Sequence, residues 1–263
     1  RRYYRDILRQ YEAAVGPQLE HDIVIWPESA IPRLYENARP FLDPIDRRAR
    51  RADSTLITGI PTAPEPGVFH NSIVALGQGS GLYHKQRLVP FGEYVPLEQW
   101  LRGLIAFFDL PMSNFSRGPA GQAALRAGSH RAAPFICYEI VYPGLVASGS
   151  RNADLLVTIS NDTWFGASIG PLQHLEMARM RALENGRYLL RGTNNGVTAI
   201  IDHRGRIRGR TAQFEEATLV GDARAMLGHT PFTSFGTAPV IGGCTVLLLL
   251  MALAYRLFWR EGR

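Results

Sequence analysis

Three short runs of mainly apolar residues, each ending at a polar residue, constrain the fold of this chain more than any other feature. They cover residues 23–26, 133–136 and 153–159. A run without regular polar alternation is typical of a strand buried on both faces, as in parallel sheets. Such strands separated by helical patterns indicate an α/β domain. Because ligands bind at the carboxyl ends of strands in open α/β sheets, the residues that follow these runs are candidates for a site.

The second run ends at Cys137, and Glu139 follows before a turn closed by Pro143. A lone thiol at a strand end, where side chains leave the core, is a candidate nucleophile. The alternative is a buried structural cysteine, since a free cysteine packs as a small hydrophobic residue.

Two other strand ends offer a base and a cation. Pro27 cannot donate to a sheet ladder, so pairing stops there and Glu28 is expected to project from the sheet edge. A solvated loop glutamate is the alternative reading of Glu28. Lys85 ends another predicted strand, and Glu93 follows in a proline-bounded loop. A thiol, a carboxylate and an ammonium, each from its own strand end, form a possible catalytic set.

The spacing of apolar residues and the turn-forming residues predict the other elements. Helices are expected over residues 3–19, 38–52 and 171–186. Further strands are expected over 54–59 and 69–76, within 189–202, and over 217–221. The stretch 61–67, rich in proline, is predicted to be a turn, and hairpin connections are expected at 77–81 and 202–205.

Composition limits the classes of ligand. The chain has a formal net charge of +6, but its basic residues are not interleaved with aromatics as nucleic-acid binding requires, so no nucleic-acid partner is expected. Attraction to anionic lipid headgroups explains the charge better if the protein sits on a membrane. The sequence has no Cys/His cluster at metal-ligand spacing and no glycine-rich phosphate loop, so neither a metal nor a cofactor is expected.

Two apolar segments suggest contact with a membrane. Residues 238–255 carry no charge, and with flanking residues they reach the roughly 20 needed for a transmembrane helix, with Trp259 at the interface. Arg256, Arg260 and Arg263 predict a cytoplasmic C-terminus by the positive-inside rule. The segment from Trp100 to Met112 is either a helix packed on the core or an arm that enters lipid. The expected organisation is a catalytic domain over 1–228, a linker over 229–237 and a membrane helix over 238–259.

The stretches around the candidate residues resemble one family. Trp-Pro-Glu-Ser-Ala-Ile-Pro around Glu28, the segment from Lys85 to Glu93, and Cys-Tyr-Glu from Cys137 are similar to the Glu–Lys–Cys set of the nitrilase, or carbon–nitrogen hydrolase, superfamily. The fuller strings resemble its apolipoprotein N-acyltransferase branch. Further similar strings lie at 160–166, 173–179 and 193–196, so that the resemblance covers about residues 23–221 and includes the terminal apolar helix.

The resemblance implies an αββα sandwich and ping-pong acyl transfer at the periplasmic face of a bacterial inner membrane. A phospholipid, usually phosphatidylethanolamine, donates an acyl chain to the N-terminal amine of an apolipoprotein that begins with a diacylglyceryl cysteine. Glu28 is then the general base, Cys137 the nucleophile that becomes a thioester, and Lys85 the cation that stabilises the oxyanion.

The resemblance also implies supporting roles. Glu93 matches a second glutamate that holds the lysine and helps to position substrate. Tyr138 and Glu139 follow the nucleophile and are expected to shape the pocket, and Asn161 and Trp164 are expected to contact substrate. Members of this branch carry a multi-helix membrane domain and a first sheet strand that are not recognised here. The chain is therefore expected to be a C-terminal fragment of a longer protein, whose activity without these parts is open.

Two rival functions remain at this stage. One is an amidase or nitrilase that hydrolyses its thioester with water, against which the apolar arm and the terminal helix argue. The other is a membrane-anchored binding domain on an inactive nitrilase scaffold, against which the presence of all three catalytic residue types argues.

Overall fold

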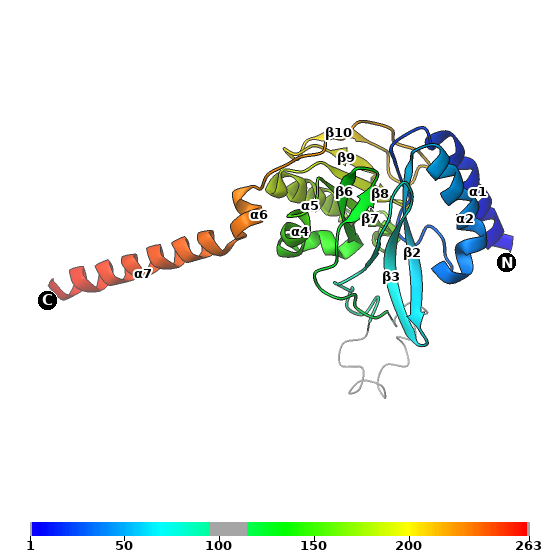
Figure 1. Ribbon diagram of the computed structural model, residues 1–263. Helices are drawn as coiled ribbons and strands as arrows, with labels where there is room; N and C mark the ends of the chain where they lie inside the picture. The colour runs from blue at the N-terminus through cyan, green and yellow to red at the C-terminus, as the bar shows by residue number, and fades with distance from the viewer. Residues whose placement is uncertain (1, 95–114, 262–263) are drawn as a thin grey trace, which may run out of the picture.

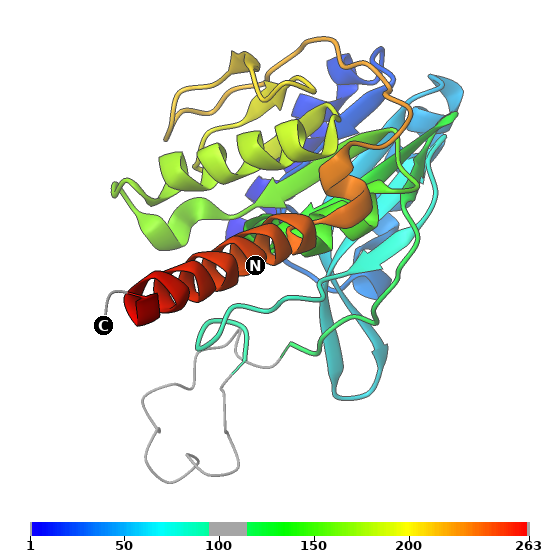
Figure 2. The same ribbon diagram turned by 90° about the vertical axis from the view of Figure 1, so that its left-hand side faces the viewer.

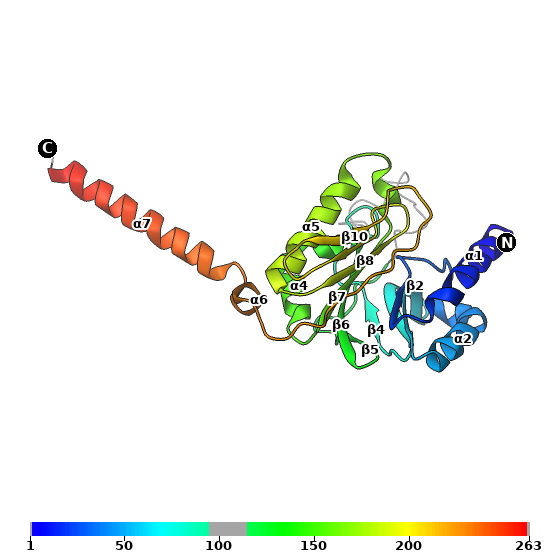
Figure 3. The same ribbon diagram turned by 90° about the horizontal axis from the view of Figure 1, so that it is seen from above.

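The computed structural model describes residues 2–94 and 115–261, and the sandwich within them has four layers: helices, sheet, sheet, helices (Figures 1 and 3). The helices and 3₁₀ turns are α1 (Arg2–Gln18), α2 (Tyr35–Arg51), η2 (Cys137–Val141), α4 (Pro143–Ser150), η3 (Asp162–Phe165), α5 (Gly170–Asn185), α6 (Pro231–Phe235) and α7 (Ala238–Glu261). The strands are β1 (Ile23–Ile25), β2 (Thr55–Glu65), β3 (Val68–Gly77), β4 (Leu82–His84), β5 (Leu125–Ala127), β6 (His130–Ile136), β7 (Leu155–Ser160), β8 (Leu189–Thr193), β9 (Ala199–Ile201) and β10 (Ile207–Arg210).

The first sheet has the order β1-β2-β3-β4. β1 pairs with β2 in parallel, and β3 runs antiparallel to both β2 and β4. β1 and β4 therefore point in the same direction, and their carboxyl ends lie at one edge of the sheet. Glu28 follows the first of these strands and Lys85 the second.

The second sheet has the order β10-β9-β8-β7-β6-β5. Its middle strands β6, β7 and β8 are parallel, whereas the outer pairs are antiparallel. Cys137 follows β6, and Asn161 follows β7. The predicted parallel strands are thus confirmed, and their carboxyl ends bring these residues to one edge.

Apolar side chains fill three interfaces between the layers. Between the two sheets lie Ile57 and Ile73 from the first sheet and Ile136, Val157 and Ile159 from the second, all fully buried. The helices α1 and α2 cover the outer face of the first sheet, and α4 and α5 cover that of the second. Because both faces of the middle strands are covered, these strands lack polar alternation, and the predicted αββα sandwich is confirmed.

Two local predictions are wrong. The stretch 61–67 is not a loop, because β2 continues to Glu65 paired with β3, with a register shift between Thr62 and Glu65, and only the tight connection at Pro66 and Gly67 is a turn. The short β1 pairs only with residues 55–57, and the last backbone contact on this edge of β2 is from the Gly59 amide to the Pro27 carbonyl, so no strand pairs with the edge at Pro61 and it tolerates proline. Residues 217–221 form no strand, since Leu219 packs against the core while its backbone joins no sheet.

The tail forms the continuous helix α7, which projects from the body beyond α6 (Figures 1 and 2). Residues Ala238–Arg256 have a mean hydropathy of 2.1, and within the described chain this is one helix long and apolar enough to cross a membrane. The short helix α6 lies within the predicted linker over 229–237. The predicted arm from Trp100 to Met112 lies outside the described residues.

Candidate active site

The backbone of Glu28 is fixed by the strand beside it. Beyond β1 the Trp26 amide donates to the Ile57 carbonyl over 2.9 Å, and the Pro27 carbonyl accepts from the Gly59 amide over 3.3 Å. A Cβ atom at Gly59 of β2 would lie 2.7 Å from the Glu28 Cα, so only glycine lets the two chains approach this closely. The side chain of Asn194 also donates to the Glu28 carbonyl over 2.8 Å. These contacts hold Glu28 at the sheet edge.

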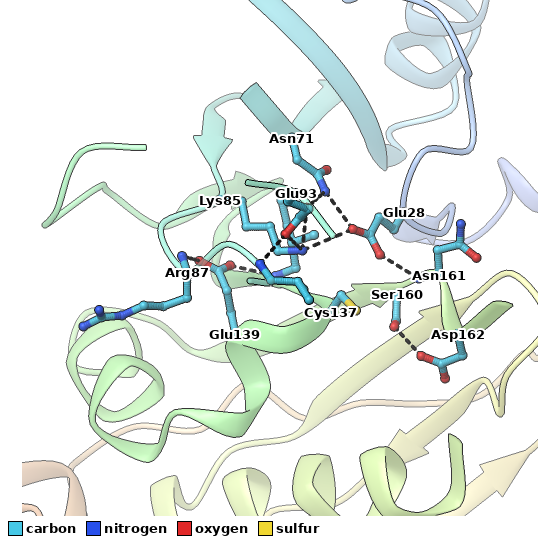
Figure 4. A network of polar contacts seen from close by, with 12 residues as sticks. Glu28, Asn71, Lys85, Arg87, Glu93, Cys137, Glu139, Ser160, Asn161 and Asp162 are labelled. Carbon is cyan, nitrogen blue, oxygen red and sulfur yellow. Dashed lines mark hydrogen bonds and ion pairs between the residues drawn. The ribbon is translucent and has the colours of Figure 1, made fainter. Parts of the chain in front are cut away.

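Glu28, Asn71, Lys85 and Glu93 form a buried polar group that we call the front cluster (Figure 4). Lys85 Nζ lies 2.9 Å from both oxygens of Glu93 and 3.4 Å from Glu28 Oε1. Asn71 Nδ2 donates to Glu28 Oε1 over 2.7 Å and to Glu93 Oε1 over 2.9 Å. One ammonium and one amide therefore hold two carboxylates close together.

Two backbone amides complete the hydrogen bonding of these carboxylates. The amide of Asn161 donates to Glu28 Oε2 over 2.7 Å, and that of Val89 donates to Glu93 Oε2 over 2.8 Å. Burial alone lowers the pKa of Lys85, but the nearby charges of Glu28, Cys137 and Glu93 outweigh it, so the pKa is raised. Lys85 therefore stays a cation, although its side chain is only 1% exposed.

Cys137 adopts an unusual backbone conformation at the start of η2. Its φ of 49° lies in the left-handed region, which costs a residue other than glycine about 1–3 kcal/mol. Burial, followed by the negative charge of Glu28, raises the pKa of the thiol to about 12, although the charge of Lys85 opposes the shift. At neutral pH the sulfur is therefore a thiol, and a nearby base has to remove its proton.

Glu139 joins the lysine loop to the nucleophile strand. Its carboxylate accepts from the Gln86 and Arg87 amides over 2.6 and 3.1 Å, and from the Ile136 amide over 2.9 Å. It also accepts from the Tyr83 hydroxyl. Burial raises the pKa of Glu139, which the hydrogen bonds from Ile136 and Gln86 oppose. This residue fixes the separation between the segments that carry Lys85 and Cys137.

A second buried group, the rear cluster, lies on the other side of Cys137 and comprises Ser160, Asp162, His174 and Arg191. Arg191 Nη2 donates to Asp162 Oδ2 over 2.7 Å, and Ser160 donates to Asp162 Oδ1. His174 Nδ1 lies 3.0 Å from the same Oδ1 atom. Burial alone raises the pKa of Asp162, but the hydrogen bond with His174 and the charge of Arg191 outweigh it, so the pKa is lowered.

The rear cluster meets the nucleophile through its backbone. His174 Nε2 lies 3.0 Å from the Cys137 carbonyl oxygen. A Cβ atom at Gly196 would lie 2.1 Å from Asp162 Oδ2, so the loop after β8 can cover the cluster only with glycine there.

Cys137, Asp162 and His174 present potential ligand atoms within 4.8 Å of one another, yet the contacts argue against a metal centre. Both oxygens of Asp162 already accept hydrogen bonds, and His174 Nε2 is occupied by the Cys137 carbonyl. The guanidinium of Arg191 also repels a cation at this point.

The remaining predicted residues lie around the same sheet edge. The backbone of Asn161 contacts Glu28, whereas its side chain accepts from the Thr163 amide and caps η3. Trp164 is 63% exposed on η3. The rings of Tyr138 and Tyr142 meet edge to face, with centroids 5.1 Å apart.

Sequence reasoning assigned no role to Asn71, Asp162, His174 or Arg191. Two of them could have been found, because Asn71 and Arg191 are polar residues inside predicted strands and a buried polar group needs a partner. Asp162 and His174 lie in segments whose similarity was noted but whose contacts the sequence does not give.

The family model described as carbon–nitrogen hydrolase matches residues 5–231. Curated relatives named apolipoprotein N-acyltransferase include one from Azotobacter vinelandii, which is 54% identical over 96% of this chain and 48% of its own length. Another, from Vibrio vulnificus, is 45% identical over 92% of this chain and 49% of its own length. The chain thus spans about half the length of the curated relatives it matches.

Solved structures share the fold at low sequence identity. A carbon–nitrogen hydrolase from Helicobacter pylori superposes with a TM-score of 0.61 at 15% identity, covering 81% of this chain and 80% of that one. A mutant of an amidase of the nitrilase superfamily from Nesterenkonia AN1 gives 0.58 at 17% identity, covering 81% of this chain and 82% of that one.

Proposed function

Because this chain belongs to the carbon–nitrogen hydrolase family, we propose that it carries the catalytic site of an N-acyltransferase. In this proposal the site moves a fatty acyl chain from a phospholipid, through a thioester on Cys137, to the N-terminal amine of a diacylglyceryl-cysteine lipoprotein. The observation that carries the proposal is the convergence of Glu28 and Lys85, from strand ends of the first sheet, with Cys137, from a strand end of the second. The high identity to proteins named apolipoprotein N-acyltransferase selects this reaction among those of the family.

In the first half-reaction, Glu28 takes the thiol proton while the Cys137 sulfur attacks the ester carbonyl carbon of the phospholipid. General-base help is needed because the thiol pKa is about 12. The negative charge that forms on the ester oxygen lies near the Lys85 ammonium, and one such donor is worth about 100- to 1,000-fold in rate. The carbon–oxygen bond then breaks, the proton on Glu28 passes to the lysophospholipid, and the thioester remains.

The second half-reaction keeps these roles of Glu28 and Lys85 with a new nucleophile. The amine of the lipoprotein attacks the thioester carbonyl, Glu28 accepts its proton, and Lys85 again faces the oxyanion. The carbon–sulfur bond breaks, an amide forms, and the proton returns to the Cys137 sulfur. No atom is lost or oxidised in either step.

The supporting residues have distinct tasks in this scheme. Glu93 holds the Lys85 ammonium, and Glu139 fixes the loop that carries it. Tyr138 lines the approach to the sulfur. The Asn161 amide orients Glu28, and the exposed ring of Trp164 contacts the lipid substrate.

The membrane part of the proposal rests on α7. We propose that residues 1–228 form the catalytic domain, 229–237 link it to the membrane, and 238–259 span the inner membrane with a cytoplasmic C-terminus. The apolar helix Ala238–Arg256 supports the span, and basic residues after it support the orientation. The catalytic domain then lies on the periplasmic face, where phosphatidylethanolamine serves as donor.

The test is mass spectrometry of the full-length protein after incubation with phospholipid vesicles that lack any lipoprotein acceptor. We expect an acyl adduct on Cys137 in the wild type and in Cys244→Ser, which changes only the thiol of α7, but not in Cys137→Ala. Adding a lipoprotein peptide with a free N-terminal amine should discharge the adduct. Rapid turnover of small amides by water would instead favour a hydrolase, and an unmodified thiol would favour an inactive binding domain.

A further inference from the structure

We propose that Asp162, His174 and Arg191 are positioning residues for the nucleophile, which they hold by its backbone carbonyl rather than by its sulfur. The inference rests on the proposed function, because it takes Cys137 to be the nucleophile. Its basis is the contact of His174 Nε2 with the Cys137 carbonyl oxygen at 3.0 Å.

The direction of this hydrogen bond follows from chemistry. A carbonyl oxygen only accepts, so Nε2 must carry a proton and donate it. Nδ1 lies between Asp162 Oδ1 at 3.0 Å and Arg191 Nη2 at 3.2 Å. A ring protonated on both nitrogens donates from Nδ1 to Asp162, and a neutral ring accepts there from Arg191. In both states Nε2 remains the donor to Cys137.

The ring is held from behind by residues that cannot move easily. Asp162 has no solvent exposure and accepts from both Arg191 and Ser160. Arg191 itself is 2% exposed and comes from the central strand β8. His174 is on α5, which packs against the second sheet. The hydrogen-bond donor therefore has one fixed position with respect to the end of β6.

What this donor fixes is the left-handed turn at the nucleophile. Cys137 has a φ of 49°, and its carbonyl is the group that His174 holds. Without the donor, the carbonyl loses its side-chain partner and keeps only the backbone contacts of η2, so the turn can relax and rotate the thiol away from Glu28. Because Nε2 is already engaged, His174 does not serve as the base for the thiol, although its ring lies close to the sulfur.

The experiment compares two substitutions of His174 in the full-length protein carrying Cys244→Ser, so that Cys137 is the remaining thiol of residues 1–263, and its alkylation is followed on its own peptide by mass spectrometry. Glutamine keeps an N–H donor at about the reach of Nε2, whereas leucine keeps the volume but has no donor. We measure the rate of alkylation of Cys137 by iodoacetamide as a function of pH. His174→Leu should change this rate about tenfold and displace the midpoint of its pH profile. The reason is that the thiol moves away from the charges of Glu28 and Lys85, which set its pKa. His174→Gln should keep the rate and midpoint of its parent to within about threefold.

Leu175→Ala is the matched control for lost packing on α5, since Leu175 is buried beside His174 in sequence and lacks polar groups. It should lower the temperature of unfolding without moving the pH profile. Equal profiles for His174→Leu and the parent would overturn the proposal, as would a glutamine variant that behaves like leucine. Should the leucine variant not fold, Asp162→Asn is scored in the same way, and an unchanged profile overturns the proposal. Alkylation needs no lipid, so absence of an acyl adduct would refute the acyl transfer alone.

Discussion

Cys137 lies between two buried polar clusters (Figure 4). Each cluster pairs a carboxylate with a cation, but the two contact Cys137 differently. The front cluster comes from the ends of β1 and β4 and from β3, and its charges act on the sulfur, since Glu28 raises and Lys85 lowers the thiol pKa. The rear cluster comes from β7, η3, β8 and α5; His174 binds the backbone carbonyl of the same residue, while Ser160 lowers and Asp162 raises the thiol pKa. Both clusters therefore act on the sulfur, but the rear cluster also binds the backbone of Cys137.

The two clusters also differ in charge balance. The front cluster has two carboxylates for one ammonium, and amide donors such as Asn71 complete it. In the rear cluster the charge of Asp162 is matched by that of Arg191. Burying charges is costly even when they are paired, so neither cluster is explained by stability alone. We expect the front cluster to govern the rate of chemistry and the rear cluster to govern the folded geometry.

The largest expected effect that tests this distinction is loss of the cation in the front cluster. Lys85→Met keeps the aliphatic stem but removes the ammonium, so the oxyanion loses its donor and two buried carboxylates lose their partner. We expect acyl-enzyme formation to fall by at least about 100- to 1,000-fold, measured as the rate of adduct formation by mass spectrometry.

The control for this substitution is Arg131→Met, which removes a surface cation whose side chain is 58% exposed. It should leave the rate unchanged. Near-normal acylation of Lys85→Met, in protein that unfolds at the wild-type temperature, would break the assignment of chemistry to the front cluster.

The next effect should appear in stability. Arg191→Leu leaves the buried Asp162 carboxylate without its cation, and breaking a buried pair in this way costs about 3–5 kcal/mol. Thermal unfolding in detergent measures the loss. The double variant with Asp162→Asn should recover part of it, because the uncompensated charge is gone. A single variant as stable as the wild type, but without acyl-enzyme formation, would mean that the rear cluster acts on the chemistry directly.

A third effect separates the two tasks of Glu28, which are to raise the thiol pKa by its charge and to accept the thiol proton as general base. Glu28→Gln removes the negative charge that helps to raise the thiol pKa to about 12, so that pKa should fall toward the ordinary value of 9.0. Each unit of decrease gives tenfold more thiolate at a given pH below the midpoint. Alkylation of Cys137 at neutral pH should therefore become faster while acyl transfer is lost. A slower alkylation would show that Glu28 does not face the sulfur.

The sequence predicts the front cluster better than the rear one for a physical reason. Lys85 and Cys137 each follow a strand directly, and Glu28 lies three residues after β1. A strand end specifies where its next residues lie. His174 is in the middle of α5, and its partner at Cys137 is 37 positions away, so only the packing of α5 on the second sheet brings them together. The same limit explains the error at 217–221, where an apolar pattern reflects packing of Leu219 without strand pairing.

The smallest expected effect lies at the exposed edge of the site, outside both clusters. Trp164 is 63% exposed, so Trp164→Ala should change the free energy of unfolding by no more than about 0.5 kcal/mol. Phe165 and Ile169 are also exposed, at 41% and 65%, so η3 and the residues after it present three large apolar side chains to solvent. If this surface contacts the acyl chain, the variant should acylate several-fold more slowly from phospholipid vesicles, but at the wild-type rate from a short-chain thioester. Equal slowing with both donors would place Trp164 among the residues that position Cys137, and the division between the buried clusters and the exposed edge would then have to be redrawn.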